Sequence, residues 1–146
     1  MKLRTTVKII IISFLLFMAV IGAIVIVSHS LASNMKNLPV GEKIDSYDSP
    51  SGEYTVNIYL DNGGATVDFA IRGELLNNSN NIKKNIYWCY ARNSAKVEWI
   101  DNETVVINGK TLNVLTDVYN WRTDSHWDDN YDIYTGQWKD IATSDI

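Results

Sequence analysis

The stretch SPSGEYTVNIYLDNGGATVDFAIRGEL, residues 49–75, decides the fold of this chain. After a Pro-Ser-Gly turn, apolar and polar residues alternate from Tyr54 to Leu60. Asp-Asn-Gly-Gly follows at 61–64, and these residue types tolerate positive φ angles. Alternation then resumes at Val67. A period of two on both sides of such a turn predicts an antiparallel β-hairpin with a turn of about two to four residues.

The alternation assigns each residue of this hairpin to one of two faces. We predict an inward, apolar set: Tyr54, Val56, Ile58, Leu60, Val67, Phe69 and Ile71. The outward set contains Asn57, Tyr59, Asp68, Arg72 and Glu74. Asp68 and Arg72 lie about 13 Å apart along an extended strand, so they are available to a neighbouring strand or to a ligand rather than to each other. The outward set is our candidate binding face, with cross-strand charge pairing on a solvated face as the alternative.

Short strands joined by tight turns account for the rest of the predicted domain. Alternation predicts strands in NIYWCY (85–90), KVEWI (96–100), TVVI (104–107) and TLNV (111–114). In the first of these, Ile86, Trp88 and Tyr90 are expected to share the inward face. Because connections this short cannot make parallel crossovers, we predict an all-β fold, a single small antiparallel meander sheet or open barrel of about six strands.

An apolar run near the N-terminus predicts one transmembrane helix. Residues 9–27 contain no charge, and a helix of this length covers most of a hydrocarbon core of about 30 Å. Basic residues precede the run, which predicts a cytoplasmic N-terminus and an extracytoplasmic C-terminal domain at the cell membrane. The run is longer than a secretory signal of about 7–15 apolar residues, which favours an uncleaved signal anchor. Small residues at 30–32 leave open cleavage near Ala32 and secretion.

The chain is therefore expected to contain five segments. They are a cytoplasmic N-terminus at 1–8, a transmembrane signal anchor at 9–27, a polar stalk at 28–48, an extracytoplasmic β-domain at 49–116 and an acidic aromatic tail at 117–146. The tail combines seven Asp with Trp121, Trp127 and Trp138. Acidic segments that lack aromatic residues are typically disordered, so this composition favours docking on the sheet or on a partner, and the tail is our second candidate contact surface.

Charge and cysteine content narrow the functional classes. Residues 37–146 contain nine basic and seventeen acidic residues, a net charge of −8, which argues against a nucleic-acid partner. The single cysteine, Cys89, cannot form an internal disulfide and is expected to be a buried, inert thiol. An exported domain without disulfides fits the envelope of a Gram-positive bacterium.

The sequence contains no convincing catalytic or metal-binding motif. Asp128, Asn130 and Asp132 match the start of a calcium loop, but Ile133 and Lys139 stand where that loop needs Gly and Glu. Two histidines and one cysteine are too few for a typical zinc site, and the Gly-x-Ser-x-Gly elbow of serine hydrolases is absent. We therefore predict no catalytic residues, no metal and no cofactor.

Three blocks of the sequence resemble a known family. The blocks are residues 49–75, KKNIYWCY at 83–90 and VEWIDNETVVINGKTLNV at 97–114. They are similar to the small Gram-positive proteins of domain of unknown function 5412, which carry an N-terminal membrane segment followed by such a block. The Ser-Pro-x-Gly start, the Asn-Gly-Gly-Ala-Thr turn, the Arg-Gly-Glu strand end and the Trp-Ile-Asp-Asn-x-Thr-Val turn occur in this order over about residues 48–120. The resemblance implies an envelope location and supplies no catalytic residues.

Together, these observations favour a membrane-anchored, extracytoplasmic, non-catalytic binding or interaction module of the bacterial envelope. Residues 9–27 would anchor it in the lipid bilayer, and its partner would be an envelope protein or a wall polymer. Two alternatives stay open. One is a small hydrolase or transferase that acts on the cell wall and uses Asp68 and Glu74 as its carboxylates. The other is a structural or phage-derived accessory protein without a ligand.

Overall fold

The computed structural model describes residues 2–129, 131–132 and 137–138 and separates the chain into two units. The first unit is helix α1 (Lys2–Ala32), and the β-rich unit begins at Met35. Within α1, Thr6–Leu31 is the one segment among the described residues that is long and apolar enough to cross a membrane. The predicted apolar helix before a β-rich domain is therefore confirmed.

The β-rich unit consists of short strands and one 3₁₀-helix. Their bounds are β1 (Glu42–Asp48), β2 (Tyr54–Asn62), β3 (Phe69–Asn77), β4 (Lys83–Tyr90), β5 (Val97–Trp99), β6 (Thr104–Ile107), β7 (Lys110–Asn113), β8 (Tyr119–Asn120), η1 (Trp121–Thr123), β9 (Tyr131–Asp132) and β10 (Gln137–Trp138).

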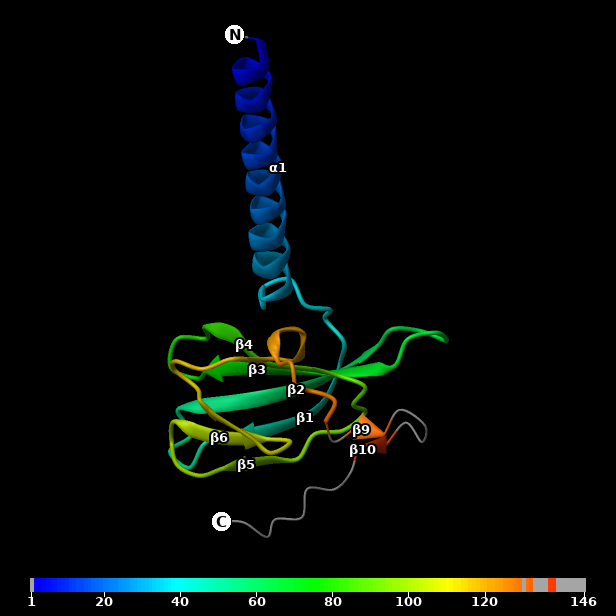
Figure 1. The fold of residues 1–146 in the computed structure, drawn as a ribbon. Coiled ribbons are helices and arrows are strands. Elements are labelled where there is room, and N and C mark those ends of the chain that lie inside the picture. The colour runs from blue at the N-terminus through cyan, green and yellow to red at the C-terminus, as the bar shows by residue number, and fades with distance from the viewer. Residues whose placement is uncertain (1, 130, 133–136, 139–146) are drawn as a thin grey trace. The chain divides into compact units, whose positions relative to one another are not determined.

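Two sheets form the body of this unit (Figure 1). The larger has the order β1-β2-β3-β4-β8, and the smaller has the order β5-β6-β7, while β9 and β10 pair with each other. Strands β1 to β4 form an antiparallel meander, but β8 pairs with β4 in parallel. The prediction of one purely antiparallel sheet is therefore wrong. The chain between β4 and β8 builds the second sheet, and this connection is long enough for a parallel crossover.

The predicted hairpin in 49–75 exists as β2 and β3, with a longer turn than expected. The strands pair from Tyr54 opposite Asn77 to Asn62 opposite Phe69, which leaves residues 63–68 as the loop. The predicted turn of two to four residues is too short. As a result, Val67 and Phe69 are 49% and 40% exposed instead of facing the core.

The hydrophobic core lies between the two sheets. Its buried residues are Tyr54, Val56, Ile58, Ile71, Leu75, Ile86, Tyr87, Cys89, Val105, Ile107, Leu112 and Val114. The inward assignment of the alternate residues of β2 is confirmed, and Cys89 is a buried free thiol as predicted.

A β-bulge in β4 reverses the predicted faces of that strand. The β3–β4 register skips Ile86, which is the extra residue of the bulge. Tyr87 consequently belongs to the core cluster, and Trp88 lies on the opposite face of the sheet. The prediction that Ile86, Trp88 and Tyr90 share the inward face is wrong, because a shift of one residue moves every later side chain to the other face.

Residues 42–48, expected within a polar stalk, form the edge strand β1. It pairs with β2 from Glu42 opposite Leu60 to Asp48 opposite Thr55. Most of its side chains are exposed, several are charged, and its register is irregular between residues 43 and 45. Charges and irregular register both protect an exposed edge from pairing with another chain.

Gly73 offers a test of how closely β3 packs against Tyr87 of the neighbouring strand β4 and against Ile107 of β6. A Cβ at this position would lie 2.9 Å from Tyr87 Cβ and 3.5 Å from Ile107 Cδ1. Alanine in a strand normally stabilises by about 0.5–1 kcal/mol relative to glycine. We nevertheless expect Gly73→Ala to lower the free energy of unfolding by about 1–3 kcal/mol, because the added methyl group overpacks the core.

The measurement is urea unfolding of the full chain in detergent micelles, followed by tryptophan fluorescence. Glu98→Ala, on the exposed side of β5, is the control and should change the free energy of unfolding by less than about 0.5 kcal/mol. A Gly73→Ala variant as stable as wild type would contradict the close packing of β3 against Tyr87 and Ile107.

Candidate functional site

The outer face of the five-stranded sheet, which points away from the three-stranded sheet, contains most of the predicted binding residues, but it is not an open surface. Asn57 and Arg72 are only 4% and 6% exposed, and Tyr59 and Glu74 are half-buried. Asn57 accepts a hydrogen bond from the Ser46 hydroxyl at 2.9 Å. Within the part of the chain that the structure describes, two segments contact this face: residues 35–41, here called the linker, and residues 119–129.

Arg72 is the centre of a polar network on this face, here called the Arg72 network. Its Nη1 donates hydrogen bonds to Glu74 Oε2 at 3.3 Å and to Asn85 Oδ1 at 2.8 Å. Its Nη2 donates to the Val40 carbonyl at 2.7 Å. The guanidinium also lies 3.9 Å from the centre of the Tyr59 ring, which is a cation–π contact. One planar side chain thus contacts β2, β3, β4 and the linker.

The Arg72 network fixes the linker against the sheet. Besides the bond from Arg72 to Val40, Asn85 Nδ2 donates to the Met35 carbonyl at 2.7 Å. At the end of the linker, Gly41 has a φ of +65°, and a Cβ there would lie 2.7 Å from the Leu60 carbonyl oxygen. Residues 35–41, which the sequence placed in a stalk, are therefore bound to the domain.

Glu74 is a charged member of this network. Its Oε1 lies 3.3 Å from Lys83 Nζ and accepts a hydrogen bond from the Tyr59 hydroxyl at 3.3 Å. Burial raises the pKa of Glu74, but the hydrogen bonds and charges of Lys83 and Arg72 outweigh burial and leave the pKa below its usual value. A general acid that works near neutral pH needs the opposite shift, so this environment suits a structural ion pair.

Asp68 lies apart from the Arg72 network. It belongs to the β2–β3 loop, where its N–H donates to the Tyr90 hydroxyl at 3.3 Å and its Oδ2 accepts from the Tyr131 hydroxyl at 3.3 Å. Six residues separate Asp68 from Glu74, roughly 20 Å along an extended chain. The two carboxyl groups of a glycoside hydrolase lie about 5–9.5 Å apart. The structure therefore does not bring together the two carboxylates of the predicted wall-hydrolase alternative.

An aromatic cluster lies beside the Arg72 network, and three of its four rings belong to the tail that the sequence made a second candidate contact surface. Tyr90 stacks on Trp121 with ring centres 5.2 Å apart, and Trp127 meets both rings edge-on at 6.1 and 5.0 Å. Tyr131 stacks on Trp127 at 6.2 Å. These four residues are half-buried and lie outside the core. The surplus of aromatic residues in the tail indicates such a contact surface, whereas the alternation in residues 85–90 gives no sign that Tyr90 joins it.

Strand β8 positions the aromatic cluster. Its pairing with β4 places Asn120 opposite Trp88, and η1 with Trp121 follows directly. The Asn120 side chain accepts from the Arg122 N–H at 3.1 Å, which caps this short helix. Arg122 Cζ then lies 5.7 Å from the Trp88 ring centre. Residues 119–129 and Tyr131 therefore pack on the domain, as one of the two predictions for the tail proposed.

The acidic side chains of this region do not form a metal site. Among the residues that the structure describes, no group of three or more His, Cys, Asp or Glu side chains is arranged to hold a metal ion. Asn130, Ile133 and Lys139 of the compared calcium loop lie outside the described residues.

Glu74 makes part of the stability dependent on pH. The pKa of Glu74 is lower in the folded chain than its ordinary value of 4.5, which applies to the unfolded chain. Its stabilising contribution to the free energy of unfolding is therefore fully present above pH 4.5 and is lost as the pH falls through the pKa of the folded chain. Glu74→Gln should lower the free energy of unfolding at pH 7 by about 1–3 kcal/mol. It should also lose less stability than wild type as the pH falls from about 5 to about 3.

Urea unfolding at several pH values checks this expectation. Other carboxylates also have lowered pKa values, among them Asp101, Asp117 and Asp124, so the difference between the variant and wild type is the informative quantity. Glu98→Gln, on the exposed side of β5, is the matched control. If Glu74→Gln and wild type lost the same stability on acidification, the ion pairs of Glu74 would contribute nothing.

Comparison with known sequences matches the chain to a protein family. The sequence profile of a family described as a family of unknown function (DUF5412) matches residues 4–124. The match is longer than the 48–120 suggested by the motifs, and it includes most of α1, the linker, β8 and η1. No curated protein and no solved structure matches the chain.

Proposed function

From the premise that this chain belongs to the DUF5412 family, we propose that it is a membrane-anchored, non-catalytic binding module of a Gram-positive envelope. Helix α1 would hold it in the cell membrane with the N-terminus in the cytoplasm, and the β-rich unit would lie outside. Its partner would be another envelope component, a protein or a wall polymer. The family description assigns no activity, so the proposal rests on the geometry of the chain.

This proposal rests on a division of the outer face into two parts. The charged groups pair with each other within the domain, whereas the aromatic groups remain partly exposed. Arg72 and Glu74 bond to each other and to neighbouring residues, and Arg72 holds the linker. The aromatic cluster lies outside the core and remains half-exposed. Tyrosine and tryptophan, which combine an apolar ring with a polar tip, are enriched in the centres of protein interfaces. The cluster is therefore the better candidate contact surface.

Cysteine labelling tests the proposed orientation. We expect Ser94→Cys, in the exposed loop after β4, to react with a membrane-impermeant maleimide in intact cells, and Thr5→Cys to react only after permeabilisation. Wild type is the matched control, because its single cysteine, Cys89, should not react with the maleimide. Cys89 is only 2% exposed, and burial raises the pKa of its thiol. The opposite labelling pattern would reverse the topology. A shortened protein in the medium would support cleavage near Ala32.

Photo-cross-linking in native membranes tests the binding role. A benzoylphenylalanine at Ser125, an exposed position beside the aromatic cluster, should give an adduct of discrete mass after irradiation. The same group at Thr111, exposed on β7 of the other sheet, is the control and should give none. No adduct at Ser125, or the same adduct at both positions, would contradict binding through this surface.

A further inference from the structure

We propose that the β2–β3 loop and the aromatic cluster form one docking surface, and that its partner is a positively charged polypeptide segment with apolar side chains. This inference rests on the proposed function and names the class of partner. The docking surface consists of Val67, Asp68 and Phe69 together with Tyr90, Trp127, Asp128 and Tyr131.

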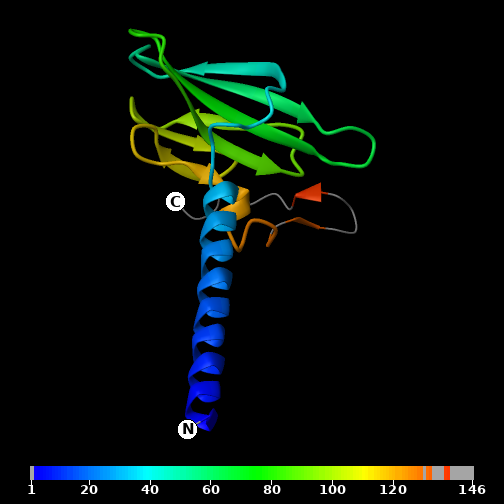
Figure 2. The same ribbon diagram turned by 90° about the horizontal axis from the view of Figure 1, so that it is seen from above.

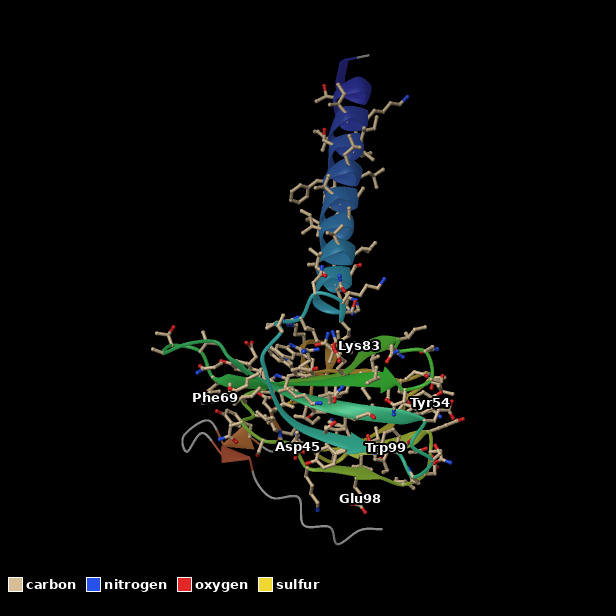
Figure 3. All side chains as sticks on the ribbon, turned by 180° about the vertical axis from the view of Figure 1, so that it is seen from behind. Asp45, Tyr54, Phe69, Lys83, Glu98 and Trp99 are labelled. Atoms are coloured by element: carbon tan, nitrogen blue, oxygen red, sulfur yellow. The ribbon has the colours of Figure 1, made fainter. Side chains whose placement is uncertain are left out.

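The β2–β3 hairpin extends beyond the strands on either side of it. Pairing with β1 reaches only to Leu60, and pairing with β4 reaches only to Ala70. The loop between them projects from the sheet (Figures 1 and 2). Figure 3 shows Phe69 at the end of the sheet opposite Tyr54. Apolar side chains in this position lie outside the core, and Val67 is 49% and Phe69 40% exposed.

The loop is bound to the aromatic cluster. Asp68 is the connection, since its N–H donates to the Tyr90 hydroxyl and its carboxylate accepts from the Tyr131 hydroxyl. In addition, the Arg92 N–H donates to the Phe69 carbonyl at 3.2 Å. The exposed apolar residues of the loop therefore adjoin the rings of the cluster. Exposed apolar groups that adjoin aromatic rings and have a polar rim are typical of interaction sites.

The charges around this surface favour a cationic partner. Three carboxylates, Asp68, Asp128 and Asp129, are exposed there against the guanidinium groups of Arg92 and Arg122, and residues 37–146 as a whole have a net charge of −8. This negative charge repels anionic lipids and acidic polymers, and it attracts the side chains of lysine and arginine. Cations also bind the faces of tryptophan and tyrosine. The chain already makes such contacts internally, because Arg122 Cζ lies 5.9 Å from the Trp121 ring centre.

The test uses the full chain in phosphatidylcholine nanodiscs, which carry no net charge. The probe is a labelled synthetic peptide of leucine and lysine, and binding is followed by fluorescence anisotropy at two salt concentrations. A peptide with glutamate in place of lysine and vesicles of phosphatidylglycerol are the comparison ligands. We expect the lysine peptide to bind, more weakly at higher salt, and the two anionic ligands not to bind.

Two variants separate the apolar and the charged parts of the surface. Val67→Ser with Phe69→Ser should weaken binding of the lysine peptide about tenfold. Asp68→Asn with Asp128→Asn should weaken it about threefold and reduce its dependence on salt. Ile82→Ser, at an exposed apolar position beside β4, and Glu98→Gln are matched controls that should change the affinity by less than about twofold. An unchanged thermal transition in each variant excludes a folding defect.

Three outcomes would overturn the inference. Equal effects of site and control variants would mean that the peptide binds by overall charge alone. Binding of phosphatidylglycerol vesicles in place of the peptide would make this a lipid-binding surface. A third outcome combines a cross-link from Ser125 in native membranes with unchanged peptide binding in the Val67/Phe69 variant. It would contradict a cationic peptide as the partner but would still support the proposed binding function. Absence of that cross-link would count against both.

Discussion

The hydrogen bond from the Arg72 guanidinium to the Val40 carbonyl is the interaction on which the outer face depends. A buried guanidinium is tolerated only when charged and polar partners surround it, and Arg72 has Glu74, Asn85 and Tyr59 beside it. Removing Glu74 would leave the buried Arg72 guanidinium without its anionic partner. The linker, β3 and β4 are therefore held together as one unit, and this unit closes the middle of the sheet to solvent.

A second constraint, the bulge at Ile86, decides which aromatic residues reach the outer face. Without the extra residue, Trp88 and Tyr90 would point into the core. With it, Trp88 lies opposite Arg72 and Tyr90 stacks on Trp121. The Arg72 network and the aromatic cluster thus share β4 as their support. The same bulge places the Tyr87 side chain in the core, where its ring stacks on Tyr119 of β8 with ring centres 5.2 Å apart.

Local sequence patterns predicted the local structure well, but they did not predict contacts between residues far apart in the sequence. Alternation placed Val56 and Ile58 in the core, and the resemblance to the family was correct. Alternation alone cannot reveal a bulge, since it assumes one register throughout. It also cannot show that Arg72 bonds to a carbonyl 32 residues earlier, because every residue has a carbonyl. Of the candidate site, Tyr59, Arg72 and Glu74 meet in one network, whereas Asp68 joins the aromatic cluster.

The attachment of the linker also determines how the domain would respond to tension. A pull transmitted along the chain from α1 first loads the bond between Met35 and Asn85, and then the bond between Val40 and Arg72. Both donors belong to strands inside the sheet, β3 and β4. Edge strand β1, which is the strand most easily peeled away, experiences force only after these two side-chain bonds have broken. The two bonds therefore protect the edge of the sheet from a force applied through α1.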